Sequence, residues 1–345
     1  MIKTLETWAI SLGALAVSFV LIAIFISSTG NSPWEVFHSM YRGAFGSWFS
    51  WQNTLVRAAP LMLTALCTAL PARVGLIVIG GEGAVVLGGL MAAVTGITLQ
   101  QMPAYFVLFA MIVVAAATGG LWIAAVGALK YFRNVNETIS SLLLNYIAIA
   151  ILNFLVVGML KDPATLNNPS THAIGDQNMI GSIGDSSIHW GLLYGLVVCL
   201  AMWIVTHLST FGFSANVVGG NIRAARLAGL PVAKVLLISC FLGGAAAGIA
   251  GMIEVAAVHG RANSSLNAGY GYAGILVAFL ARHNPLAIIP YALLLGGIQA
   301  SGGLLQRAHE LPDATGSVIQ GIIFMVILSS ELVYGRIKWL QPKAV

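Results

Sequence analysis

The chain is divided into apolar runs that are long enough, or nearly long enough, to cross a lipid bilayer. A membrane-spanning helix needs about 20 consecutive, mostly apolar residues. Such runs predict an all-α polytopic integral membrane protein with about ten transmembrane helices, folded as a single transmembrane domain over residues 1–345. The predicted spans, to within a few residues at each edge, are 8–28, 52–70, 76–97, 104–129, 138–160, 190–207, 235–258, 267–281, 286–304 and 316–334.

One predicted span differs from the others in length and composition. The run 267–281 is short and rich in glycine. Broken helices are tolerated at membrane depth where protein or a water-filled cavity surrounds them. We therefore expect this run to form a tilted half-helix or a re-entrant segment.

The composition agrees with a lipid environment and excludes several other classes of protein. Only 8% of the residues are charged, whereas a soluble domain typically has about 25%. The net charge of +5 does not indicate nucleic acid as a partner, because the basic residues form no stripe. Three cysteines, Cys67, Cys199 and Cys240, lie in apolar runs without the spacing of metal ligands.

The distribution of basic residues predicts the orientation. With the N-terminus in the cytoplasm and ten alternating spans, eleven lysines and arginines lie on the cytoplasmic side and five outside, as the positive-inside rule requires. Both termini are then cytoplasmic, 161–189 is an outer loop long enough to fold locally, and 208–234 is a cytoplasmic segment. The cytoplasmic set is Lys3, Arg73, Lys130, Arg133, Arg223, Arg226, Lys234, Arg282, Arg336, Lys338 and Lys343; the outer set is Arg42, Arg57, Lys161, Arg261 and Arg307.

The chain lacks the motifs of the common catalytic sites. It has no phosphate-binding loop with its lysine, no HExxH and no GxSxG. We therefore expect no enzymatic activity, no bound metal and no cofactor in this chain.

Glu82 is the most conspicuous polar residue within a predicted span. A carboxylate within the membrane is costly and suggests a functional site. It lies in the glycine-rich sequence Gly80-Gly81-Glu82-Gly83. The residue is a candidate for the solute pathway, and the alternative is a structural hydrogen bond to unwound backbone amides.

Other polar and aromatic residues in the spans are weaker candidates for the same pathway. Asn145 and Asn153 are expected on roughly one face of their helix, and they or Gln299 could equally join neighbouring helices. Tyr270 and Tyr272 could stack on a planar or pyranose ligand, or anchor the chain at the membrane interface.

The cytoplasmic segment contains a short basic helix between glycines. Asn221 is its predicted N-cap, Arg223 and Arg226 project one turn apart beyond it, and Gly229 precedes Pro231 at its end. With Ala224 and Ala225 between the arginines, the helix is predicted to protrude and to dock into a groove on a cytoplasmic partner.

Four stretches of the sequence resemble motifs of one family of transport proteins. Residues 219–230, GGNIRAARLAGL, resemble the coupling-helix signature of permeases of the ribose/branched-chain amino acid class of ABC importers. Residues 79–83, IGGEG, are similar to another motif of that class. Residues 137–148, ETISSLLLNYIA, and 271–280, GYAGILVAFL, resemble segments of its nucleoside-importer subgroup.

The resemblance implies a function and a set of partners. The chain would be a permease subunit that moves nucleosides or related solutes inward by alternating access. Its partners would be a second, often non-identical permease, an ATPase with two nucleotide-binding domains that uses the ATP, and an extracytoplasmic substrate-binding protein, all at a bacterial inner membrane. The alternatives are a simple-sugar permease or an ion-coupled carrier.

The sequence departs from the motifs of that class at two positions. Val78 stands where the family usually has asparagine, and Ala84 where it often has glutamine. If those polar residues line the pathway in relatives, this subunit contributes less to recognition than its partner.

Overall fold

The computed structural model describes residues 2–165, 168–312 and 314–333. Within the described residues the chain forms two compact units. Unit 1 comprises residues 1–54 and 294–345, and unit 2 comprises residues 55–293. The predicted C-terminal basic cluster at 336–343 lies outside the described residues.

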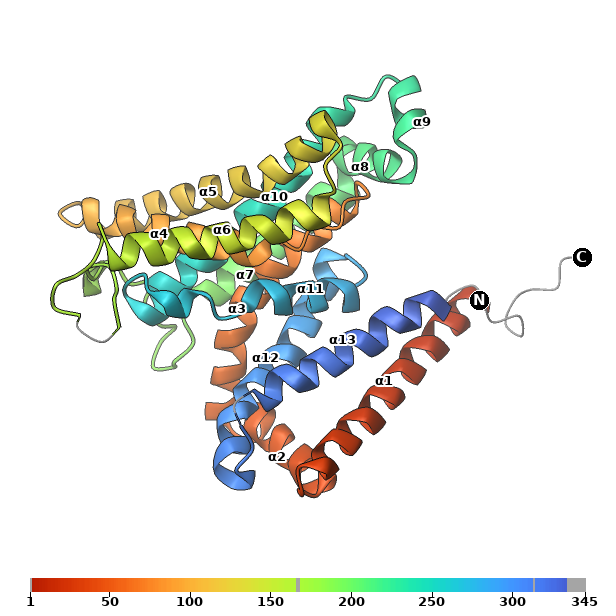
Figure 1. The fold of residues 1–345 in the computed structure, drawn as a ribbon, viewed down its shortest axis with the longest axis vertical. Helices are drawn as coiled ribbons and strands as arrows, with labels where there is room; N and C mark the ends of the chain where they lie inside the picture. Colours follow the sequence, from red (N-terminus) through yellow and green to blue (C-terminus); the bar gives the residue numbers. More distant parts are fainter. Residues whose placement is uncertain (1, 166–167, 313, 334–345) are drawn as a thin grey trace, which may run out of the picture. The chain divides into compact units, whose positions relative to one another are not determined.

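Unit 2 is a helical bundle (Figure 1). Within it α4, α5 and α10 pack directly on one another, and α4 also packs on α6 and α11. A π-helical turn, Glu254–His259, continues α10. Its helices are α3 (Trp48–Ala72, from residue 55 on), α4 (Gly81–Thr98), α5 (Ala104–Arg133), α6 (Glu137–Val157), α7 (Gly191–Leu208), α8 (Thr210–Gly220), α9 (Ile222–Leu227), α10 (Val232–Ile253), α11 (Tyr270–Leu280) and the first turns of α12 (Pro285–His309).

Unit 1 contains α1 (Ile2–Ser28), α2 (Pro33–Phe45), the first residues of α3, most of α12 and α13 (Thr315–Val333). In this unit α1 packs on α13 and on α2. The axis of the helix turns by 110° between 13–28 and 33–45. Because Gly30 has a φ of +83°, it supplies a backbone conformation that other residues rarely adopt at this bend.

The prediction of an all-α polytopic membrane protein is confirmed. Each of the ten predicted spans coincides with helix over most of its length. Among the described residues seven helices are long and apolar enough to cross a membrane, and the bent pair α1–α2 would make an eighth. The helix α11 is short, with 11 residues, as the glycine-rich run predicted.

Close packing of glycines explains how α10 approaches two neighbours at once. A Cβ atom on Gly244 or Gly248 would collide with the backbone of α5, at Gly119 and Ala115 respectively. A Cβ on Gly251 would collide with the α4 backbone at Val85. Small residues let helix backbones approach closely in membranes, so these glycines allow α10 to pack against both α5 and α4.

The outer segment expected at 161–189 is folded rather than extended. Its backbone amides at Thr171 and Ile174 donate to the carbonyls of Ala262 and Gly260, at 2.9 and 3.0 Å. Arg261 lies 4.0 Å from the carboxylate of Asp162. The segment is therefore attached to the connection between α10 and α11.

Candidate functional site

The chain between α3 and α4 contains a non-helical stretch, residues 76–80, where a continuous helix was expected from residue 76. Several of its backbone hydrogen bonds are made by side chains of α6. The Thr138 hydroxyl donates to the Ile77 carbonyl at 3.0 Å, and the Ile79 amide donates to the Ser141 hydroxyl at 3.1 Å. Irregular backbone within a membrane requires such partners, so the sequence of α6 explains the break.

Asn145 completes this row of α6 side chains. Its Nδ2 donates to the Ile79 carbonyl at 3.0 Å, and its Oδ1 accepts a hydrogen bond of 2.7 Å from the Gly83 amide. The side chain is fully buried. From the α3 side, the Thr68 hydroxyl donates to the Val78 carbonyl at 3.3 Å. Asn145 thus joins α6 to the N-terminus of α4.

Glu82 lies in the first turn of α4 and faces the N-terminus of α11. Its Oε1 accepts a hydrogen bond of 2.8 Å from the Gly269 amide, and its Oε2 accepts one of 2.6 Å from the Gly271 amide. The side chain is 0% exposed. The first amides of a helix have no intrahelical partner and carry partial positive charge, so the carboxylate satisfies two of them and is itself stabilised.

Glycines make this junction between α4 and α11 possible. Gly269 has a φ of +82°, in the left-handed region that favours glycine. A Cβ atom on Gly271 would collide with the backbone nitrogen of Glu82. The two helix N-termini therefore meet backbone to backbone, and we call Glu82, Gly269 and Gly271 the α4–α11 junction.

The two tyrosines at the start of α11 have different environments. Tyr270 is buried and lies near the side chain of Arg57. Tyr272 is 40% exposed and lies near the side chain of Asn145. Tyr272 is therefore the tyrosine with free ring surface beside the junction.

The remaining pathway candidates lie apart from the buried junction or outside its unit. Asn153 is exposed on α6, although Asn145 is buried. Eight residues correspond to about 2.2 helical turns, so the two amides are rotated by about 80° and do not share one face. Gln299 belongs to unit 1, and its Oε1 is buried without a hydrogen-bond partner among the described residues.

The second candidate site is the short helix α9. The Oδ1 of Asn221 accepts hydrogen bonds from the amides of Arg223 and Ala224, at 2.9 and 3.1 Å. At the other end Gly229 has a φ of +76°, and the amide of Leu230 donates to the carbonyl of Ala225 at 3.0 Å. These are the N-cap and the glycine-terminated C-cap that the sequence predicted.

The surface of α9 is basic and partly apolar. Arg223, Ala224 and Arg226 are exposed, and only Ala225 in this helix is buried. Leu227 is 91% exposed, although the sequence analysis assigned it no role. The Arg226 guanidinium lies 5.7 Å from the centre of the Tyr131 ring. An exposed leucine next to an exposed arginine is suited to contact with another protein.

The end of α8 contacts the turn that leads into the broken segment. A Cβ atom on Gly219 would collide with the carbonyl oxygen of Arg73. The Arg73 guanidinium in turn donates to the Thr206 carbonyl at 3.4 Å and lies 3.3 Å from the His207 ring nitrogen. His283 lies in the turn after α11, and burial of its ring lowers its pKa. The charge of Arg73 lowers the pKa of His283 further. The turn after α3 therefore contacts the ends of α7 and α8.

The described residues contain no group of three or more histidine, cysteine, aspartate or glutamate side chains that could hold a metal ion. The three cysteines are buried and unpaired with one another. The side chains of Glu82 at the α4–α11 junction and of Asn145 on α6 are bonded to backbone, which is a structural arrangement rather than one of acid–base catalysis.

Broken spans joined at helix N-termini, small-residue packing and a protruding capped helix define a multi-spanning transport protein. Comparison with known families agrees with this class. Residues 50–328 match the family described as branched-chain amino acid transport system / permease component, and the chain belongs to that family. It is a non-catalytic, membrane-spanning component of an ABC importer, a class that works with an ATPase and a binding protein; no cofactor is indicated for the permease itself.

Individual relatives cover nearly the whole chain. A guanosine ABC transporter permease protein of Bacillus subtilis is 30% identical over 98% of this chain and 99% of its own length. A glucose ABC transporter permease protein of Haloferax volcanii is 30% identical over 93% of this chain and 86% of its own. A nucleoside ABC transporter permease protein of Lactococcus lactis is 26% identical over 91% of this chain and 88% of its own.

Proposed function

We propose that the chain imports nucleosides or related solutes by alternating access, driven by a separate ATPase. The observation that carries the proposal is the full-length similarity to a guanosine permease. Two structural features agree with it: the capped helix α9 and the α4–α11 junction. Each step requires a ligand with different affinity for the two states of the permease. A simple-sugar substrate is the second candidate, favoured by the similarity to a glucose permease.

We propose that this subunit pairs with a second, non-identical permease in a bacterial cytoplasmic membrane, with both termini in the cytoplasm. Two different permeases from Bacillus subtilis and two from Lactococcus lactis are similar to this chain. That pattern supports a heterodimer. An ATPase with two nucleotide-binding domains and an extracytoplasmic binding protein complete the proposed complex.

In the proposed pathway the candidate residues have two roles. Tyr272 and Asn153 have exposed side chains and are available to contact solute. The other three side chains are buried: Glu82, Asn145 and Tyr270. They hold α4, α6 and α11 together and so fix the positions of Tyr272 and Asn153.

Gln299 is the remaining member of the proposed pathway set. Its buried, unpartnered Oε1 can accept a hydrogen bond from a solute hydroxyl or amine. An unsatisfied buried acceptor is costly, so a polar ligand would lower the free energy of this site.

We propose that α9 transmits the ATPase cycle through one chain of contacts. The ATPase would bind Asn221–Arg226 and Gly229, and α8 would move with it. The contact of Gly219 with Arg73 would carry that movement to 76–80 and then to Glu82 and α11. Each link is a packed or hydrogen-bonded contact within unit 2, which is the physical continuity that coupling needs.

The test is uptake by the complete complex in proteoliposomes, with ATP inside or outside and a solute panel of guanosine, adenosine, ribose and glucose. We expect ATP-dependent uptake of a nucleoside, in competition with the other nucleosides. Preferential uptake of glucose or ribose would replace the nucleoside assignment by the sugar one. Uptake that survives without ATP but stops when the proton gradient is collapsed would overturn the importer mechanism.

A further inference from the structure

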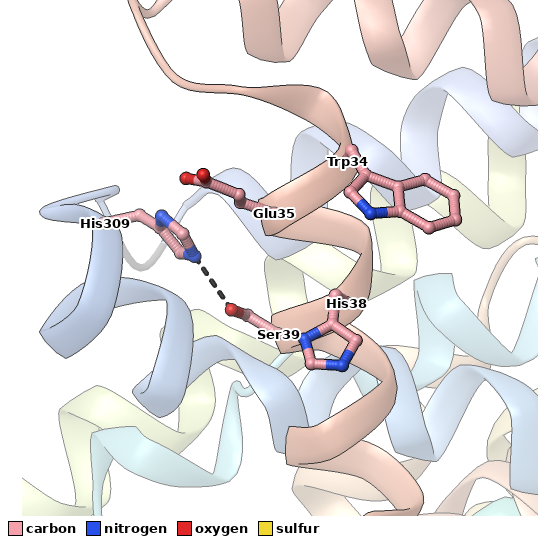
Figure 2. Close-up of a pocket in the computed structure, with 5 residues that line it drawn as sticks. All are labelled: Trp34, Glu35, His38, Ser39 and His309. Atoms are coloured by element: carbon pink, nitrogen blue, oxygen red, sulfur yellow. Dashed lines mark hydrogen bonds between the residues drawn. The ribbon is translucent and has the colours of Figure 1, made fainter.

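A shallow groove in unit 1 has a chemistry that the transport function does not use. It lies between the first turns of α2 and the end of α12, and its volume is about 400 Å³. The residues that line it are Trp34, Glu35, His38, Ser39 and His309 (Figure 2). We propose that this groove binds the head group of a phospholipid that carries a primary ammonium beside its phosphate, as phosphatidylethanolamine does.

The position of α2 relative to α1 indicates that the groove lies at the membrane interface. Because α2 turns by 110° from the preceding apolar helix, it runs close to the bilayer plane if that helix crosses the bilayer. Trp34, Tyr41 and Trp48 expose their rings in this part of the chain, by 80%, 64% and 64%. Exposed tryptophan and tyrosine are typical of the head-group layer.

The buried side of α2 is fixed to unit 1, so the groove has a defined shape. Val36 and Ala44 are buried, and the Thr54 hydroxyl donates to the Ala44 carbonyl at 2.8 Å. A Cβ atom on Gly43 would lie 3.0 Å from the Cα of Ser301 in α12. The helix therefore packs on α12 with one face, and Trp34 and Glu35 remain exposed.

The lining offers separate partners for the two charges of the head group. The Glu35 carboxylate can accept hydrogen bonds from an ammonium, which a quaternary choline group cannot donate. Ser39 Oγ and His309 Nε2 are 2.8 Å apart, which leaves the other ring nitrogen of His309 for the phosphate. Figure 2 shows Glu35 and His309 on one side of α2 and Trp34 and His38 on the other.

The two groups on one side of α2 suit the two charges of the head group. The phosphate would lie near His309 and the ammonium near Glu35 (Figure 2).

The experiment uses the full-length chain reconstituted into vesicles with equal amounts of phosphatidylethanolamine, phosphatidylcholine and phosphatidylglycerol. The protein is extracted in mild detergent, and the lipids that remain bound are quantified by mass spectrometry. We expect enrichment of phosphatidylethanolamine over both other lipids. Glu35→Gln should lower that enrichment roughly two- to fivefold, the size of a single exposed ion pair.

The matched control is Glu310→Gln, which removes an exposed carboxylate next to His309 that does not line the groove. It should retain the enrichment, and thermal unfolding of both variants should match that of the wild type. Equal retention of all three lipids by the wild type, or equal loss in both variants, would overturn the proposal. So would displacement of the lipid by soluble phosphoethanolamine at comparable concentration, because the groove would then be a site for a soluble ligand.

Discussion

The α4–α11 junction and the helix α9 are both built around a capped helix N-terminus, but their surroundings are opposite. At the junction the cap is a carboxylate from another helix, and Glu82 is 0% exposed. At α9 the cap is the local Asn221 side chain, and Leu227 beyond it is 91% exposed. A long-range cap fixes two helices together, whereas a local cap lets a short helix protrude. The first arrangement holds α4 and α11 together, and the second leaves α9 exposed for the contact with the ATPase proposed above.

The largest effect is expected from removing the carboxylate of the junction. Glu82→Ala leaves the buried amide of Gly271 and the part-buried amide of Gly269 without partners, at a cost of about 1–3 kcal/mol for each. The free energy of unfolding should fall by about 2–6 kcal/mol, measured by denaturant or thermal unfolding in detergent. Glu310→Ala, at an exposed site, is the control. Unchanged stability with loss of uptake would mean that Glu82 acts on the solute instead of holding α11.

A smaller effect is expected from a methyl group at the same junction. Gly271→Ala places a Cβ atom against the α4 backbone at Glu82, which must move to accommodate it. Overpacking of this kind typically costs about 1–3 kcal/mol. Gly321→Ala in α13 is the matched control, since a Cβ atom there meets nothing within 4 Å. If both substitutions have the same effect on unfolding, the backbone contact is not a source of stability.

At α9 the expected effect is on coupling. Arg223→Glu reverses an exposed charge and should change the free energy of unfolding by less than about 0.5 kcal/mol. Stimulation of the ATPase by substrate-loaded binding protein should fall roughly tenfold or more, as for an arginine at the centre of an interface. Lys161→Glu, in the segment folded against the α10–α11 connection, provides the charge-matched control. Normal stimulation in the Arg223 variant would remove α9 from the proposed contact with the ATPase.

The sequence predicted local structure more completely than long-range contacts. Apolar runs identified the helices, and the residues that start and end α9 identified its caps, because such signals are confined to a few neighbouring residues. The junction depends on an amide 187 residues from Glu82. The glycine-rich run indicated an irregular start of α11, and the costly carboxylate indicated an irregular start of α4. Neither signal indicates that these two helix ends contact each other.

The polar row on α6 was missed for a related reason. Thr138 and Ser141 resemble ordinary helix residues, and their function is visible only beside the carbonyl and amide of 77–79. A signal did exist: Thr138, Ser141 and Asn145 recur at spacings of three and four, which is one face of a helix. A polar face on an otherwise apolar helix predicts a polar neighbour, and here that neighbour is unpaired backbone.

The smallest expected effect separates the shape of α9 from its charge. Asn221→Ala removes the hydrogen bonds to the amides of Arg223 and Ala224. Loss of an N-cap costs about 1 kcal/mol, and a helix of six residues has little other stabilisation. Coupling should therefore fall roughly fivefold, while the global unfolding transition of the bundle stays unchanged. Asn221→Asp restores an oxygen acceptor and should recover ATPase stimulation. Normal ATPase stimulation in Asn221→Asp with reduced stimulation in Asn221→Ala would show that the ATPase recognises the folded helix. Equal loss of stimulation in both variants would assign the effect to the asparagine amide itself.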